Sequence, residues 1–269
     1  MGLLSDGMPS CLDTSSIVLS ALLWKKNCGS LKLYADSLFA SFIDRSGLTD
    51  LWDDGIDTMT LDSIPASVNQ RVFWSAAKLF ALKDADCPVA MVDNDLFFWK
   101  DVGPRLNASA VTVLHREELW DCYVPKRLLG ISPGYCFDPA WSWRVKPCNT
   151  AFAYFPDDRF KDRYTAEAIR FMTDNPGKDA AHSSQMVFAE QRILAMCARR
   201  DGIPVKTLVS NPFDEKNDMF THLWGAKKRA RGNKKDMKLL VSAIWKKIKE
   251  MDDGYYGRMV RLYPNGGEE

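Results

Sequence analysis

The stretch of sequence that decides the fold is Val89-Ala90-Met91-Val92-Asp93-Asn94-Asp95-Leu96-Phe97-Phe98-Trp99. Four apolar residues lead into Asp-Asn-Asp and four follow it, and the turn signal Asp86-Cys87-Pro88 precedes the run. So short an apolar run after a turn predicts a β-strand over 89–92 that is buried on both faces. Ionised carboxylates at the end of a buried strand need a cation or strong hydrogen-bond donors.

Two explanations fit Asp93-Asn94-Asp95. Carboxylates at this spacing suit a hard divalent ion such as Mn²⁺ or Mg²⁺, which commonly also binds the phosphates of a substrate. The same residue types are equally typical of a turn at the end of a strand. The triplet alone does not decide between a metal site and a turn.

Composition indicates an ordinary folded protein. The chain has 269 residues, 46% hydrophobic and 26% charged, which argues against disorder. A net charge of +1 gives no sign of a general polyanion binder. The seven Cys form no C-x-x-C pair, which favours reduced thiols over a disulfide framework or a zinc site. No segment approaches about 18 consecutive apolar residues. We therefore expect a cytoplasmic protein without a membrane span.

The first hundred residues alternate between helical and strand patterns. We expect helices over about 14–26, 39–44 and 67–83, and strands over 31–35, 58–61 and 89–92. This alternation predicts an α/β fold with a Rossmann-like, mostly parallel twisted sheet flanked by helices, in a single domain over 1–269. Ligands of such sheets bind beyond the carboxyl ends of the strands, where Asp36 and Asp93 are both expected.

The rest of the chain adds a long irregular segment and further helices. Residues 117–148 are aromatic and interrupted by prolines, which is typical of a functional loop. Strands are expected over 151–155 and 203–209, and helices over 158–174, 184–199 and 237–251. A basic loop over about 222–235 leads into the last helix, so a basic loop and helix span about 222–253.

A second chemical feature is His222-Leu223-Trp224-Gly225-Ala226-Lys227. Histidine is a good ligand for Mn²⁺, glycine allows close backbone approach, and lysine can pair with a phosphate. The spacing by itself is weak evidence, because a single histidine beside an aromatic residue is more often a packed surface residue.

Together the two features resemble GT-A fold glycosyltransferases, in particular the family 8-like group. Residues 89–95 resemble the metal-binding motif of that group, and His222 to Lys227 resemble its C-terminal motif. The Pro-Trp pair that often follows there is replaced by Lys228-Arg229. The motif order matches over roughly residues 15–228, and the layout is most similar to uncharacterised bacterial and phage proteins.

The resemblance implies a role for each of several residues. Asp93, Asp95 and His222 are the implied metal ligands. The donor nucleotide is expected to contact the set Asp36, Lys78, Asp93, Asn94, Asp95, Gly225 and Lys227. Asn149 stands where the group has an asparagine that lines the sugar site. Glu190-Gln191 resembles an Asp-Gln pair near the reacting centre, with glutamate replacing aspartate, which leaves the role of Glu190 open.

The implied function is transfer of a sugar from a nucleotide-diphosphate sugar, with a UDP-sugar as the expected donor. Mn²⁺ or Mg²⁺ would neutralise the charge that develops on the leaving diphosphate, and Lys227 would add a donor. The acceptor hydroxyl could belong to a glycan, a small molecule or a hydroxymethylated base in phage DNA. Neither the acceptor nor the stereochemistry is decided by the sequence.

Two other functions stay open. The basic run over 227–238 could bind the phosphates of DNA or RNA in a protein without enzymatic activity. The two aspartates could instead serve a metal-dependent phosphohydrolase, although the sequence shows no further Asp/His cluster of the kind expected. Nucleic-acid binding would survive loss of Asp93 and Asp95, whereas both enzymatic functions would not.

Overall fold

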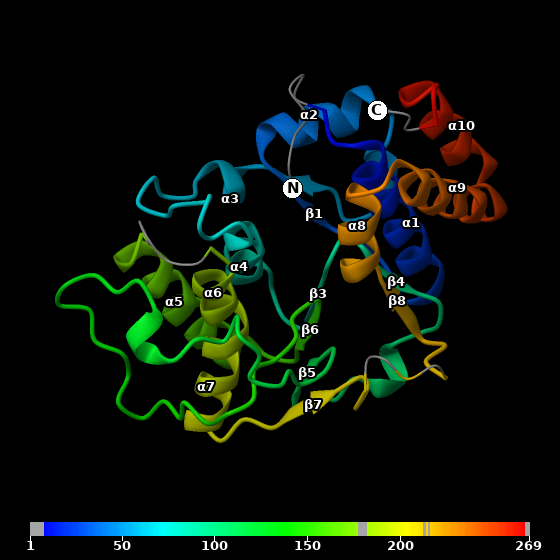
Figure 1. The fold of residues 1–269 in the computed structure, drawn as a ribbon. Helices are drawn as coiled ribbons and strands as arrows, with labels where there is room; N and C mark the ends of the chain where they lie inside the picture. The colour runs from blue at the N-terminus through cyan, green and yellow to red at the C-terminus, as the bar shows by residue number, and fades with distance from the viewer. Residues whose placement is uncertain (1–7, 177–181, 212–213, 215, 267–269) are drawn as a thin grey trace. The chain divides into compact units, whose positions relative to one another are not determined.

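A computed structural model describes residues 8–176, 182–211, 214 and 216–266 (Figure 1). The chain forms two compact units. Unit 1 consists of Met1–Thr58, Asp93–Pro104 and Lys216–Glu269, and unit 2 of Met59–Val92 and Arg105–Glu215. The chain crosses between the units four times, so neither unit is a continuous stretch. The single domain over 1–269 stays a prediction.

Unit 1 is mainly helical. Its helices are α1 (Cys11–Asn27), α2 (Ser37–Arg45), α8 (Trp224–Arg231), α9 (Lys234–Met251) and α10 (Asp253–Leu262). Its strands form two pairs: β1 (Leu33–Tyr34) runs parallel to β2 (Ile56–Asp57), and β4 (Leu96–Phe98) runs antiparallel to β8 (Phe220–His222). The described part of the chain contains no helix with the length and apolar character needed to cross a membrane.

The long helix α1 organises unit 1. The Ser10 side chain caps its first turn by accepting a hydrogen bond from the Asp13 N–H, and most residues of the helix are buried. The helix packs against α9 and against β4 (Figure 1). Ser20 Oγ donates to the Leu96 carbonyl at 2.8 Å, and Asn27 Nδ2 donates to the Phe98 carbonyl at 2.9 Å. These side chains satisfy carbonyls of a strand that has only one partner strand.

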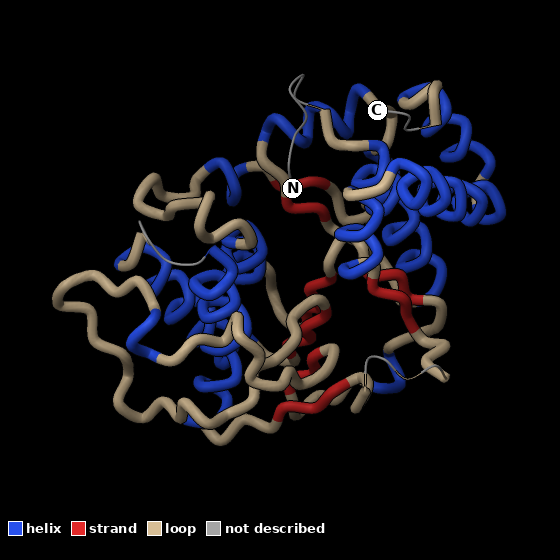
Figure 2. Tube along the Cα trace, viewed as in Figure 1, coloured by secondary structure: helices blue, strands red, loops and turns tan. Residues whose placement is uncertain are grey.

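Unit 2 is built on a four-stranded sheet with the order β3-β6-β5-β7. Its strands are β3 (Val89–Val92), β5 (Val111–Val113), β6 (Phe152–Phe155) and β7 (Val205–Thr207). Its helices are α3 (Met59–Asp62), α4 (Ala76–Asp84), α5 (Asp158–Asp174), α6 (His182–Val187) and α7 (Ile193–Arg200), with a π-helical turn at Phe188–Arg192 between the last two. Residues 117–148 form mostly loop and turn, as predicted (Figure 2).

The sheet of unit 2 is mixed, which corrects the expectation of a mostly parallel sheet. β6 runs antiparallel to both β3 and β5, whereas β5 and β7 are parallel. Three strands therefore share one direction and β6 is reversed between two of them. An apolar run predicts that a strand exists but not which way it points. The long loop that precedes β6 allows the chain to enter the sheet from the opposite end.

β3 also differs from its prediction. All four residues of Val89–Val92 are half-buried rather than buried on both faces. The strand lies at the edge of the sheet and pairs only with β6. An edge strand is less covered than a central one, so its continuous apolar pattern reflects packing on one side more than enclosure.

Several element boundaries were also wrong. The strand expected over 58–61 is the helix α3, and the helix expected over 67–83 begins only at Ala76. The basic segment over 222–235 is not a loop, because it contains all of α8 and the start of α9. Alanine, lysine and arginine favour helix, and burial of Leu223 and Ala230 anchors one face of α8. The C-terminal helix α10 follows where only a polar tail was expected.

Ser20→Ala is expected to lower the free energy of unfolding by about 1–2 kcal/mol, because the buried Leu96 carbonyl loses a hydrogen bond. Urea titration followed by tryptophan fluorescence would measure the change. Ser41→Ala is the matched control, since the exposed Ser41 hydroxyl bonds only within α2. Equal stability of the two variants would contradict a supporting role for Ser20 beneath β4.

Candidate metal centre

A turn and a strand pair bring the predicted ligands together in unit 1. The Leu96 N–H donates to the Asp93 carbonyl at 3.1 Å, which closes a turn over residues 93–96. In the antiparallel pair of β4 and β8, Leu96 lies opposite His222, and the Leu223 N–H donates to the Asp95 carbonyl at 3.0 Å. Strand pairing therefore places His222 next to Asp95 although 126 residues separate them in sequence.

Asp93, Asp95 and His222 form a cluster that could hold a metal ion. One ligand atom from each side chain lies within 4.8 Å of the others, and all three residues are half-buried. His222 Nε2 is 3.5 Å from Asp95 Oδ1. Two carboxylates and an imidazole suit a divalent ion that accepts both oxygen and nitrogen ligands. The turn and the metal site are thus compatible explanations of Asp-Asn-Asp, because the turn is what directs both carboxylates to one place.

The Asp95 carboxylate is held in its ionised form. Burial raises its pKa, but the hydrogen bond from His222 and the charge of Lys227 outweigh burial and bring the pKa of Asp95 down to about 2. A metal ligand must be deprotonated to bind. At neutral pH this carboxylate is ready to do so.

Lys227 connects the cluster to a residue that the sequence did not single out as functional. Lys227 Nζ lies 3.4 Å from Asp95 Oδ2 in the cluster and 3.2 Å from Oδ1 of that residue, Asp13. Arg231 Nη2 contacts both carboxylate oxygens of Asp13, at 3.1 and 3.2 Å. Asp13 belongs to neither of the two sequence motifs. Its signal was faint: an acidic residue in the first turn of a helix whose other residues are mostly apolar or small.

Three other predicted donor contacts lie outside this cluster. Asn94 is exposed in the centre of the turn. Gly225 lies in the first turn of α8, where an added Cβ would meet Arg229 Nη1 at an ordinary 3.7 Å, so the chain's own packing does not demand glycine there. Asp36 caps α2 by accepting a hydrogen bond from the Phe39 N–H at 2.7 Å. Their contacts with a nucleotide stay predictions.

Two of the remaining predicted residues, Lys78 and Glu190, form a second polar cluster within unit 2. Lys78 Nζ, on α4, donates to Glu190 Oε1 at 2.5 Å and to the Thr150 carbonyl at 3.1 Å. Glu190 also accepts hydrogen bonds from Thr150 Oγ1 at 2.8 Å and from Ser75 Oγ at 2.7 Å. The Glu190 side chain is 3% exposed and lies in the π-helical turn. Such turns are frequent at functional sites.

Asn149 belongs to an adjoining network. Its Nδ2 donates to Glu117 Oε1 at 2.7 Å, and its Oδ1 accepts from the Ala151 N–H at 3.1 Å. His115 Nε2 lies 3.7 Å from the same Glu117 oxygen. Residues just before β6 contact both side chains, since Ala151 donates to Asn149 and Thr150 donates to Glu190. Ser75 was missed because no local sequence pattern marks a serine that bonds across 115 residues.

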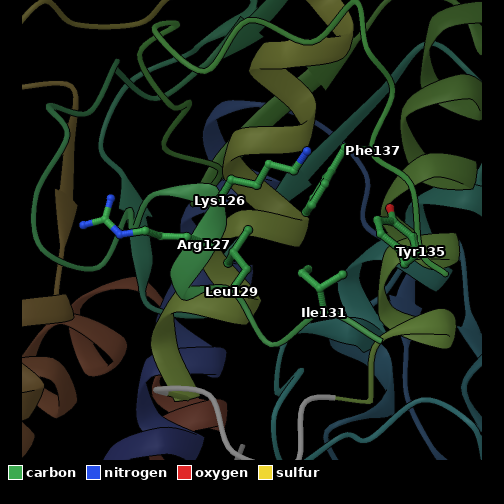
Figure 3. A pocket seen from close by; sticks show the side chains of 6 residues that line it. All are labelled: Lys126, Arg127, Leu129, Ile131, Tyr135 and Phe137. Atoms are coloured by element: carbon green, nitrogen blue, oxygen red, sulfur yellow. The ribbon is translucent and has the colours of Figure 1, made fainter. Parts of the chain in front are cut away.

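The aromatic loop of unit 2 lines a pocket of about 440 Å³. Figure 3 shows its lining side chains: Lys126, Arg127, Leu129, Ile131, Tyr135 and Phe137. Lys126 Nζ lies over the Phe137 ring, 4.9 Å from its centre. The lining contains no carboxylate or imidazole, so this pocket does not supply metal ligands. The functional role expected of the loop over residues 117–148 stays a prediction.

Comparison with known proteins assigns a family to the chain. Residues 10–262 match the family described as "Family of unknown function (DUF6734)", and the chain belongs to this family. An uncharacterized membrane protein of Schizosaccharomyces pombe is 24% identical over 144 residues, which cover 45% of this chain and 49% of that protein. The chain thus matches about half the length of this relative. No solved structure matches the chain.

Asp95→Asn is expected to lower the free energy of unfolding at neutral pH by about 2 kcal/mol in the presence of a chelator. The folded-state pKa of Asp95 lies below its ordinary value. The carboxylate therefore stabilises the fold above about pH 4, and this stabilisation is lost as the pH falls toward about 2. Urea titrations at about pH 7, 4 and 3 should show roughly half of the difference gone at the lowest pH.

The control for this pH series is Asp44→Asn, which removes an exposed carboxylate of α2 in the same unit. Its effect should be small throughout. A difference between wild type and Asp95→Asn that does not change with pH would contradict the depressed pKa of Asp95.

Lys78→Met is expected to destabilise the protein by about 3–5 kcal/mol, because it leaves the buried Glu190 carboxylate without its cation. The double variant Lys78→Met/Glu190→Gln should be more stable than the single variant, since the unpaired charge is gone. Lys83→Met, at an exposed position of the same helix, is the control. Thermal unfolding of all four proteins measures the effect, and equal losses for Lys78 and Lys83 would refute it.

Proposed function

We propose that the protein is a metal-dependent glycosyltransferase with a GT-A type fold, which moves a sugar from a nucleotide-diphosphate sugar to an acceptor hydroxyl. The observation that carries this proposal is the meeting of Asp93, Asp95 and His222 with the Lys227 ammonium beside them. Two carboxylates and an imidazole can hold Mn²⁺ or Mg²⁺. A cation at their side can pair with the oxygens of a diphosphate.

The chemistry divides between the ion and the chain. When bound, the divalent ion supplies charge neutralisation on the departing nucleotide diphosphate. The residues of unit 1 bind and orient that diphosphate: Asp93, Asp95 and His222 would hold the ion, and Lys227 would donate to a phosphate oxygen. Cation and donors pre-positioned where negative charge develops lower the barrier to cleavage of the sugar–phosphate bond.

The GT-A assignment rests on the order of elements as well as on the site. Asp93 follows directly after β3, and three of the four strands in that sheet share one direction. Polar residues placed just beyond a strand end are where α/β folds bind ligands. The expected UDP-sugar donor and the predicted cytoplasmic location, where such donors occur, belong to the same proposal.

Asn149 and Glu190 are proposed to act on the sugar rather than on the ion. Asn149 has a fixed amide, because Glu117 and the Ala151 N–H hold its two ends. Glu190 is fixed by Lys78, Ser75 and Thr150. Rigid polar groups of this kind orient a substrate at little entropic cost. The acceptor hydroxyl in this proposal belongs to a glycan, a small molecule or a base in DNA.

A second candidate is nucleic-acid binding by a basic surface on α8 and α9. We define this surface by its six exposed cationic residues, Lys228, Arg229, Arg231, Lys234, Lys235 and Lys238. Trp224, at the first position of α8, is 74% exposed and could stack on a base. This surface would serve either a protein that binds nucleic acid alone or a transferase whose acceptor is a base.

Mn²⁺ together with UDP is expected to raise the melting temperature of the wild-type protein. At ligand concentrations about 100 times Kd, binding stabilises the fold by about 2.7 kcal/mol, which corresponds to a shift of roughly 5 °C or more. Asp95→Asn should lose this shift, and Asp44→Asn should keep it. If no nucleoside diphosphate raises the melting temperature in the presence of Mn²⁺, the glycosyltransferase proposal is wrong.

Product analysis separates the proposed function from its competitors. A glycosyltransferase incubated with Mn²⁺ and UDP-sugars should release UDP and free sugar slowly when water replaces the acceptor. A phosphohydrolase that uses the same aspartates would release sugar phosphate or inorganic phosphate instead. DNA binding that persists in Asp93→Ala/Asp95→Ala, without nucleotide turnover by the wild type, would favour the nucleic-acid binder.

A further inference from the structure

Lys227 occupies the place of a counter-ion in the candidate metal centre. Its Nζ lies 3.4 Å from Asp95 Oδ2, and its side chain is only 13% exposed. Lys228, the next residue, is exposed instead. The helix α8 therefore directs one of two adjacent lysines toward the carboxylates and the other toward solvent.

Asp13 holds Lys227 from the other side. Asp13 Oδ1 lies 3.2 Å from Lys227 Nζ, and its carboxylate also accepts from Arg231 and, at 2.8 Å, from Ser10 Oγ. The Asp13 side chain is 8% exposed. Because its oxygens already have three donors, Asp13 can keep Lys227 in place but has little capacity to neutralise it further.

The charges of the centre favour joint binding of a divalent ion and a diphosphate over binding of the ion alone. Asp13, Asp93 and Asp95 carry three negative charges, and Lys227 and Arg231 carry two positive ones. A divalent ion that enters alone must approach the Lys227 ammonium and take Asp95 from it, and both effects oppose binding. A diphosphate bound with the ion supplies oxygens that pair with the displaced ammonium.

We propose that Lys227 is the resident counter-ion of Asp95, so that a divalent ion and a nucleotide diphosphate bind this centre together, each strengthening the binding of the other. Asp13 is the positioning residue that keeps Lys227 within reach of the Asp95 carboxylate and of the bound diphosphate. This inference rests on the proposed function and adds to it a coupling between the binding of the two ligands. Loss of a residue from a binding site usually weakens binding. Here removal of the Lys227 ammonium should instead improve binding of the metal alone.

Mn²⁺ binding tests the inference without any measurement of activity. Free Mn²⁺ is followed by electron paramagnetic resonance during titration of each protein, with and without UDP. Lys227→Met is expected to bind Mn²⁺ alone about fivefold or more tightly than wild type. UDP should tighten Mn²⁺ binding strongly in wild type and much less in Lys227→Met.

Two matched variants separate the contact from the charge. Lys228→Met removes the same charge from the neighbouring, exposed position, and it should bind Mn²⁺ within about twofold of wild type, as expected for a screened surface charge. Lys227→Arg keeps a cation beside Asp95 and should also bind Mn²⁺ alone much as wild type does. Tighter binding by Lys228→Met equal to that of Lys227→Met would overturn the assignment of a resident counter-ion.

A double-mutant cycle tests the positioning role of Asp13. Asp13→Asn leaves Lys227 with Asp95 as its anionic partner, so Mn²⁺ alone should bind more weakly. In the Lys227→Met background the same change should have little effect, whereas general damage to the fold would weaken binding in both backgrounds. Equal weakening in both would remove Asp13 from the proposal.

The outcomes for the two proposals are distinct. If wild type binds Mn²⁺ with UDP, but Lys227→Met binds Mn²⁺ alone no more tightly than wild type does, the counter-ion inference falls and the proposed function stands. If wild type binds no Mn²⁺ with any nucleoside diphosphate, the proposed function falls and the inference falls with it.

Discussion

The antiparallel pairing of β4 with β8 is the interaction on which the candidate metal centre depends. Three residues on each strand are enough to place His222 opposite Leu96 and next to Asp95. So short a pair is not stable by itself. α1 supports it by donating side-chain hydrogen bonds to the carbonyls of Leu96 and Phe98. The metal ligands are therefore positioned by a buried helix that contributes none of them.

The same helix also supplies the electrostatic frame of the centre. Asp13, in the first turn of α1, holds Lys227 and Arg231 from α8. Lys227 in turn approaches Asp95 in the turn before β4. A buried carboxylate is tolerated only when cations and hydrogen-bond donors surround it, and each charged group here satisfies another. This mutual dependence explains why so many charges can lie together in a half-buried place.

The polar cluster of unit 2 differs from the metal centre in its burial. Glu190 is almost fully buried and accepts hydrogen bonds from Lys78, Ser75 and Thr150, so its position is determined by the surrounding protein. The metal centre has half-buried ligands that remain accessible to an ion. The first arrangement fixes a carboxylate inside the protein, and the second leaves carboxylates and an imidazole open to a charged ligand. The proposed glycosyltransferase function uses residues of both clusters, whereas nucleic-acid binding by the basic surface would use neither.

The sequence by itself determined that the chain combines helices and strands, the positions of most of the long helices and of the strands β3 and β6, and the identity of the three candidate ligands. Each of these depends on local patterns of apolar residues or on a short motif. Only the tertiary structure decided the direction of β6 and the partners of Asp13, Glu190 and Lys227. Those features arise from contacts between residues far apart in the chain, which leave no periodic signal. Asp-Asn-Asp illustrates the division: its composition predicted either a turn or a metal site, and strand pairing with His222 made the two compatible.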